Sequence, residues 1–301
     1  MSVARLGNVR PGRLGIFSGS LAAQPASVQR IVAQEIESLG FGTLWYGEAV
    51  AREVFAQGAI FLAATTSLVV ASGIANIWAR DPMAMAAGGR ALAEAWPGRF
   101  VLGLGVSHAP MVGARGHQYA RPVSAMRDYL EKMSSAPWRG PDAALPPVVL
   151  AALGPRMVAL AAEQTAGAYP YFTTAEHIEQ VRGQLGEDPF LAADLPVVLA
   201  RNREEARAIG DPHTRTYLGT ENYRNNLIRL GWDAAELDPP GSEKLFDAIV
   251  AWGDLARVRE RVERLFNAGA DQVVLNLITR DRSVPYVPEL KTLAALNSGF
   301  A

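Results

Sequence analysis

The sequence reads RFVLGLGVSH over residues 99–108, and this stretch decides the expected fold. Its first part, Phe100–Leu104, is an uninterrupted apolar run, which is typical of a parallel strand buried on both faces. A glycine-rich turn follows and carries Ser107 and His108. Side chains that bind or react lie where parallel strands end, so the stretch predicts both a buried sheet and a site at its edge.

Short apolar runs of the same kind recur along the chain and alternate with segments of helical spacing. One helix is expected to begin at Asp81-Pro82, an N-cap residue followed by proline at the first helical position. About eight strands in 301 residues predict a (β/α)8 TIM barrel with insertion segments, and an open doubly wound sheet is the alternative. The other strands are expected at Leu14–Phe17, Thr43–Tyr46, Leu68–Ala71, Val148–Ala151, Ala168–Tyr171, Pro196–Ala200 and Gln272–Ile278.

The chain shows no linker of distinct composition, so we expect a single domain over residues 1–301. Residues 201–250 are expected to form a helical insertion. Proline-containing segments interrupt the helical spacing there, and they predict breaks at Asp211-Pro212 and at residues 238–241.

Composition excludes several classes of function. The chain has no cysteine, which excludes disulfides, thiolate metal sites and cysteine nucleophiles. The formal net charge of −1 gives no basic field for nucleic acid or for an anionic membrane surface. Residues 54–79 carry no formal charge, but their polar residues favour a helix, a turn and a strand over a membrane span. With no signal peptide in residues 1–13, we expect a cytoplasmic protein.

His108 and Glu48 are the candidate catalytic residues, because each follows directly on an expected strand. An imidazole titrates near neutral pH and can therefore give or take a proton. A structural hydrogen bond is the alternative role for His108, and charge complementation at a helix start is the alternative for Glu48. The other histidines show no metal-ligand spacing, so no metal is expected.

The Gly154-Pro155-Arg156 segment begins a helix directly after a strand. Free N–H groups at a helix start attract phosphate, and an arginine adds positive charge; a plain tight turn is the alternative. Aromatic side chains near these strand ends form a candidate wall for a flat ligand, with core packing as the alternative. They are Trp78, Tyr169, Tyr171 and Phe172.

The sequence over residues 103–109 departs from two familiar motifs. The third glycine of a dinucleotide fingerprint is replaced by His108. Residues 105–109 read GVSHA, which is one residue away from the G-x-S-x-G elbow of serine hydrolases. A nucleophilic Ser107, with His177 or His213 as its base, therefore remains an alternative function.

Several segments, in the same order along the chain, resemble the luciferase-like monooxygenase family and, within it, the coenzyme F420-dependent oxidoreductases. Each motif alone is weak, and the order and spacing of the set make the resemblance specific. The matching segments are LGIFS (14–18), GFGTLWYGE (40–48), ASGIANIWARDP (71–82), RFVLGLGVSH (99–108), LAALGPR (150–156) and AWGD (251–254).

The resemblance implies a barrel with a flavin-like cofactor at the carboxyl ends of its strands. It implies a bulge after the third strand, with a cis peptide at Gly73–Ile74, and a phosphate site on Ala152–Arg156. Ser107 and His108 fall where relatives place cofactor or catalytic residues, although some F420-dependent relatives carry Glu in place of His108. Glu48 falls where several relatives have His or another polar residue. The cofactor-binding positions are Ser18, Gly73, Ile74, Asn76, Ser107, Ala152, Leu153, Gly154, Pro155, Arg156 and Tyr169.

The expected activity is therefore hydride transfer between C5 of coenzyme F420 and a small organic substrate, with the cofactor supplying the chemistry. An FMN-dependent monooxygenase is the first alternative, and a cofactor-binding protein without turnover is another. Relatives are often dimers, so a homodimer is expected.

Overall fold

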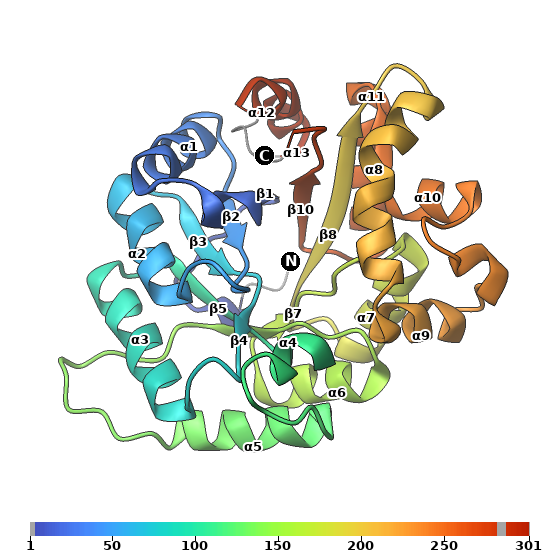
Figure 1. Ribbon diagram of the computed structural model, residues 1–301. Helices are drawn as coiled ribbons and strands as arrows, with labels where there is room; N and C mark the ends of the chain where they lie inside the picture. Colours follow the sequence, from blue (N-terminus) through green and yellow to red (C-terminus); the bar gives the residue numbers. More distant parts are fainter. Residues whose placement is uncertain (1–3, 282–286, 301) are drawn as a thin grey trace.

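A computed structural model describes residues 4–281 and 287–300, and its centre is a closed barrel of eight parallel strands (Figure 1). The ring closes because the last strand pairs with the first, Leu14 beside Val273, and with its other neighbour, Gln272 beside Ala192. The predicted barrel is confirmed, and the open sheet is excluded. The strands are β1 (Leu14–Phe17), β2 (Thr43–Tyr46), β3 (Val69–Ser72), β5 (Phe100–Gly105), β6 (Val148–Leu150), β7 (Gly167–Ala168), β8 (Phe190–Leu199) and β10 (Gln272–Leu277).

Two short strands were not predicted. β4 (Ala75–Asn76) pairs with the end of β5, and β9 (Ala251–Gly253) pairs with the end of β8. β4 places the segment that follows β3 against the carboxyl end of the barrel.

Two predicted strand boundaries were wrong for local reasons. β7 ends at Ala168, ahead of the predicted Tyr171, because Pro170 has no N–H to donate to the ladder. β8 begins at Phe190, ahead of the predicted Pro196, because Asp194 breaks the apolar run in the sequence although it lies buried within the strand.

Helices surround the barrel and pack their apolar faces against the strands (Figure 1). The predicted N-cap is confirmed, because the side chain of Asp81 accepts a hydrogen bond from the N–H of Ala84. The helices are α1 (Ala26–Ser38), α2 (Val54–Ala64), α3 (Pro82–Ala95), α4 (Ala109–Gly113), α5 (Pro122–Ser134), α6 (Pro155–Gln164), α7 (Ala175–Leu185), α8 (Arg203–Leu218), α9 (Glu221–Arg229), α10 (Glu243–Ile249), α11 (Leu255–Asn267), α12 (Val287–Ala294) and α13 (Asn297–Phe300), with 3-10 turns η1 (Ala4–Leu6), η2 (Ser20–Ala23) and η3 (Ala234–Leu237).

Residues 201–250 form α8, α9, η3 and α10, which lie between β8 and β9 in the chain. The predicted break at Asp211-Pro212 was wrong, because α8 continues through Pro212 and buries His213 and Thr214 on its inner face. The second predicted break is confirmed: residues 238–241 separate η3 from α10, and the hydroxyl of Thr214 donates to the carbonyl of Pro240 at 2.8 Å.

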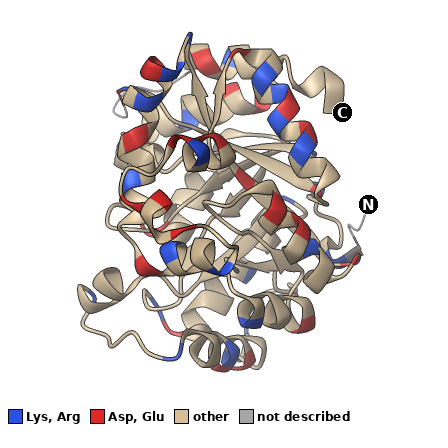
Figure 2. Cartoon of the chain, turned by 90° about the vertical axis from the view of Figure 1, so that its right-hand side faces the viewer, with Lys and Arg blue, Asp and Glu red and all other residues tan. Residues whose placement is uncertain are grey.

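The uncharged stretch from Val54 to Ala79 folds as α2, a turn and β3, as predicted, and as the additional short strand β4. In the part of the chain that the structure describes, no helix combines the length and the apolarity that a bilayer crossing needs. Basic and acidic residues alternate along the outer helices, so the face in view carries no large region of one sign (Figure 2).

Candidate active site

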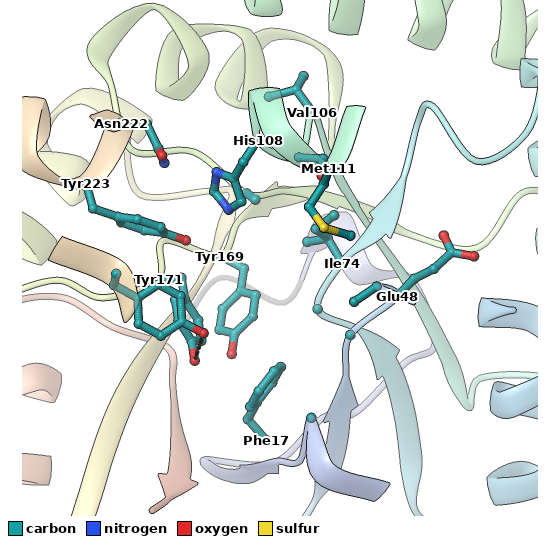
Figure 3. Close-up of a pocket in the computed structure, with 18 of the residues that line it drawn as sticks. Phe17, Glu48, Ile74, Val106, His108, Met111, Tyr169, Tyr171, Asn222 and Tyr223 are labelled. Carbon is teal, nitrogen blue, oxygen red and sulfur yellow. Dashed lines mark hydrogen bonds between the residues drawn. The ribbon is translucent and has the colours of Figure 1, made fainter. Parts of the chain in front are cut away.

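A cavity of about 560 Å³, the central cavity, opens at the carboxyl ends of the barrel strands. Segments far apart in the sequence line it. The bulge after β3 contributes Ile74, the turn after β5 contributes His108, and the segment after β7 contributes Tyr169 (Figure 3). This is the edge at which (β/α)8 barrels carry their active sites.

One side of the central cavity, which we call the bulge wall, is formed by Gly73 and Ile74, joined by a cis peptide bond as expected. Close packing requires glycine on both sides of Ile74. A Cβ on Gly73 would lie 2.9 Å from the ring of Tyr169, and a Cβ on Gly105 would lie 2.5 Å from Cγ1 of Ile74. The bulge wall is therefore apolar and closely packed from behind.

The carboxylate of Glu48 lies behind the bulge wall and points away from His108 (Figure 3). It accepts hydrogen bonds from the N–H of Asn76 at 2.9 Å and from the N–H of Val54 at 3.2 Å, and it forms an ion pair with Arg80. Its own N–H donates to the carbonyl of Ile74 at 3.1 Å. The side chain is only 4% exposed. The carboxylate that the sequence analysis proposed for proton transfer is therefore held by two backbone hydrogen bonds and an ion pair.

Arg80 lies beside Glu48 and binds carboxylates. Its guanidinium is 11% exposed and pairs with both Glu48 and Glu53. The Tyr129 hydroxyl donates to its carbonyl at 2.9 Å. Arg80 therefore neutralises the carboxylate behind the bulge wall and does not face a ligand.

His108 lies at the top of the cavity in Figure 3, at the N-cap of α4. Ser107 adopts a left-handed backbone (φ 58°), which is uncommon for a residue with a side chain and turns the chain sharply after β5. Burial lowers the pKa of His108 below its ordinary value, and a hydrogen bond with the Asn222 side chain opposes this shift. The imidazole is therefore neutral at pH 7, and its ring lies 5.6 Å from that of Tyr223.

Tyr171 and Tyr223 lie on the side of the cavity opposite Ile74 (Figure 3), and with Tyr217, which also lines the cavity and packs against Tyr171, they form the aromatic wall. The ring centroids of Tyr171 and Tyr217 are 5.0 Å apart, and their hydroxyl oxygens are 3.0 Å apart. The side-chain amide of Asn276 donates to the Tyr171 hydroxyl at 2.7 Å. Burial raises the pKa values of Tyr171 and Tyr223 well above their usual range, so both hydroxyls stay protonated.

A second cavity of about 340 Å³ adjoins the central cavity, because Ser107, Leu153 and Asn222 line both. Gly154 is the N-cap of α6, and its side of the cavity also carries Arg156. Arg229 arrives from α9, and its guanidinium lies 3.7 Å from the Cβ position of Gly154. None of the described residues that line this cavity is acidic. Two guanidinium groups and a helix start therefore make it a candidate anion site.

The structure brings most of the predicted cofactor positions to these two cavities. Ser18 and Asn76 are the exceptions, because both are buried and neither lines a cavity. The predicted positions at the central cavity are Gly73, Ile74, Ser107, Ala152, Leu153 and Tyr169, and those at the second cavity are Ser107, Leu153, Gly154, Pro155 and Arg156.

Of the four aromatic residues considered for a flat ligand, Tyr169 and Tyr171 line the central cavity. Phe172 is fully buried in the core, and the indole of Trp78 donates to the carbonyl of Val106 at 3.0 Å. Core packing is thus the role of Phe172.

The arrangement for a serine hydrolase is not formed. Ser107 lines both cavities, whereas neither His177 nor His213 lines either one. His177 Nε2 lies 3.0 Å from the carbonyl of Leu153, and the His213 ring packs 4.8 Å from the ring of Tyr217. No described contact gives Ser107 a histidine base.

Sequence reasoning missed the residues that α8 and α9 bring to the site. Tyr217 and Tyr223 complete the aromatic wall, Asn222 contacts His108, and Arg229 joins the second cavity. The spacing of Asn222, Asn226 and Arg229 places three polar side chains on one face of a helix, and this was the available signal.

Comparison with known proteins agrees with the fold. A protein of Mycobacterium tuberculosis, named as a coenzyme F420-dependent oxidoreductase, is 25% identical over 87% of this chain and 94% of its own. The coenzyme F420-dependent tetrahydromethanopterin reductase from Methanopyrus kandleri superposes with a TM-score of 0.78 at 16% identity, over 97% of this chain and 100% of that one. The oxygenating constituent of 3,6-diketocamphane monooxygenase from Pseudomonas putida, in complex with FMN, superposes with a TM-score of 0.70 at 14% identity. The superposition covers 97% of this chain and 98% of that one.

The family model of the luciferase-like monooxygenases matches residues 14–272, from the first strand of the barrel to the start of the last. The chain belongs to the luciferase-like monooxygenase family.

Proposed function

We propose that the protein is a coenzyme F420-dependent oxidoreductase that transfers a hydride between the deazaflavin and a small organic substrate. The observation that carries the proposal is the pair of adjoining cavities. The central cavity has an apolar, closely packed bulge wall, and the second cavity is lined by Arg156 and Arg229. This is the combination that a tricyclic ring with a phosphate-bearing side chain requires.

The residues present fit such a cofactor. A Cβ on Gly73 would collide with Tyr169, so the bulge wall is shaped by its glycine and leaves Ile74 as the surface for the ring. Gly154 has no side-chain cap and Pro155 has no N–H, so the N–H of Arg156 is the first that α6 offers to a phosphate. The name of the M. tuberculosis relative supports F420 as the cofactor.

The deazaflavin supplies a carbon, C5, that accepts or gives a hydride, and the chain supplies orientation and a proton path. In this proposal His108 takes the proton from a substrate oxygen when the substrate is oxidised, because its imidazole is neutral, and returns it in the reverse direction. Asn222 orients the imidazole through its hydrogen bond.

Glu48 has a positioning role in the same proposal. Its N–H bonds the carbonyl of Ile74, and its carboxylate bonds the N–H of Asn76, so one residue holds both ends of the bulge. Arg80 keeps the buried carboxylate paired.

An FMN-dependent monooxygenase is the second candidate, because FMN also combines a tricyclic ring with a phosphate. It is supported by the fold shared with the P. putida enzyme, whose structure was determined in complex with FMN. Separate titrations with F420 and with FMN, followed by quenching of cofactor fluorescence, decide between them. Tight binding of FMN without measurable binding of F420 would exclude the deazaflavin.

Two further expectations stay predictions. Light scattering of the purified protein tests the homodimer, and fractionation of cells tests the cytoplasmic location. Binding of F420 without hydride exchange across a panel of alcohols and ketones would favour a cofactor-binding protein without turnover.

A further inference from the structure

We propose that the substrate is an uncharged ring compound with a hydroxyl or carbonyl oxygen, held against the aromatic wall with that oxygen beside His108. The proposal deepens the proposed function and rests on it in one respect. If the cofactor ring lies on the bulge wall, the aromatic wall and His108 are what remain to hold the substrate (Figure 3).

The first argument is the lack of charge around the central cavity. Among the described residues that line it there is no lysine or arginine, and Glu48 is the only acidic one. The Glu48 carboxylate faces away and is paired with Arg80. An ion placed in this cavity would lose its hydration without gaining a partner, which is strongly unfavourable.

The titratable groups near the aromatic wall add no charge at pH 7. Burial lowers the pKa of His108 and raises that of Tyr171, so both are neutral. Burial also raises the pKa of Asp194 well above its usual range, and the Tyr169 hydroxyl donates to this carboxyl at 3.4 Å. The cavity therefore selects against both signs of charge.

The second argument is the shape and chemistry of the aromatic wall. Phe17 and Tyr171 meet edge to face at 5.6 Å, and Tyr217 and Tyr223 meet in the same way at 5.2 Å. Rings in these positions present faces and edges that pack well against another ring. The Tyr171 hydroxyl and the His108 imidazole are uncharged polar groups that line this cavity, and a hydroxyl or carbonyl oxygen can hydrogen-bond with either of them.

The test is a matched set of probes with one ring and different charge: benzyl alcohol, benzoate and benzylammonium, titrated calorimetrically at pH 7.5. The proposal expects benzyl alcohol to bind at least about tenfold more tightly than either ion, which corresponds to ~1.4 kcal/mol. Equal affinity for the three probes, preference for either ion, or no binding of benzyl alcohol overturns the proposal.

A variant pair moves the selectivity in a stated direction. Met111 lies on α4 and lines the cavity near His108, so Met111→Lys adds one cation there, while Met111→Gln adds an uncharged polar group of similar length. Met111→Lys is expected to bind benzoate at least about tenfold more tightly than the wild type, and Met111→Gln is not. A gain of the same size in both variants contradicts the electrostatic argument. If circular dichroism shows that Met111→Lys is unfolded, the wild-type series alone decides.

The probes are measured with and without saturating cofactor, so that the two proposals fail separately. If the protein does not bind F420, the proposed function is overturned, and the probe series on the cofactor-free protein still tests whether the cavity excludes charged ligands. Normal cofactor binding with preference for an ionic probe overturns only the substrate class.

Discussion

At the scale of single residues, the pair formed by His108 and Asn222 makes a prediction about pH. Burial lowers the pKa of His108, and the Asn222 hydrogen bond raises it, so Asn222→Ala should lower it further. NMR titration of the His108 ring protons, assigned with His108→Gln, measures both values. A wild-type pKa at or above 6.5, or an upward shift in Asn222→Ala, contradicts the assignment. For oxidation with His108 as base, kcat/KM should rise with pH through this pKa and then level off.

Glu48 and Glu53 provide a matched pair, because both bind Arg80 but differ in exposure. The Glu48 side chain is 4% exposed and Glu53 is 49% exposed. Glu48→Gln leaves a buried guanidinium with weaker pairing and loosens the bulge, so it should lower the free energy of unfolding by about 1–3 kcal/mol. Glu53→Gln acts at the surface and should cost under about 1 kcal/mol.

Cofactor titration separates positioning from a general loss of stability in this pair. Affinity for the cofactor ring should fall in Glu48→Gln and stay at the wild-type value in Glu53→Gln. Equal affinities in the two variants, measured well below their melting temperatures, would show that Glu48 supports the fold without shaping the bulge wall.

At the scale of elements, α7 is tied to the segment that follows β6. His177 lies 3.0 Å from the Leu153 carbonyl, and burial lowers its pKa to about 4, although the hydrogen bond to Leu153 raises it. The folded pKa is below that of the unfolded chain, so the unfolded chain binds the extra proton between these values. The contribution of His177 to the free energy of unfolding is therefore fully present above pH 6.5. As the pH drops toward 4, the free energy of unfolding falls by up to about 3 kcal/mol.

Urea unfolding at a series of pH values measures this loss. His177→Gln keeps a donor for Leu153 and has no titrating proton, so its stability should vary less between pH 6.5 and 4. His117 is exposed, and His117→Gln should keep the wild-type slope. An unchanged slope in His177→Gln would assign the acid sensitivity to other groups.

The elements also show what the sequence can predict. The strand β5 could be predicted from its uninterrupted apolar run, because a parallel strand that is buried on both faces is apolar at nearly every position. β4 and β9 have two and three residues, which is too short for any periodicity. α8 runs through Pro212 because the packing of its inner face outweighs the lost hydrogen bond, and local propensity does not contain that information.

The residues of the candidate site also fall into two groups, those that the sequence alone predicts and those that only the folded chain brings together. His108 and the Gly154-Pro155-Arg156 segment were found because each follows a strand in the chain. Arg229 and Tyr223 reach the cavities only through the packing of α9, and the role of Glu48 depends on Arg80, 32 residues further on. Contacts of this kind exist only in the folded chain.

At the scale of the whole molecule, the two cavities join segments that run from Phe17 to Arg229. A ligand that fills both binds only the folded chain, and at 100 times its Kd it adds ~2.7 kcal/mol to the free energy of unfolding. F420 should therefore raise the melting temperature more than the riboflavin-level deazaflavin that lacks the phosphate, at equal concentration. Arg229→Gln should remove most of that difference, whereas Arg30→Gln, exposed on α1, should keep it. Equal shifts from the two deazaflavins in the wild type would show that the second cavity does not hold the phosphate.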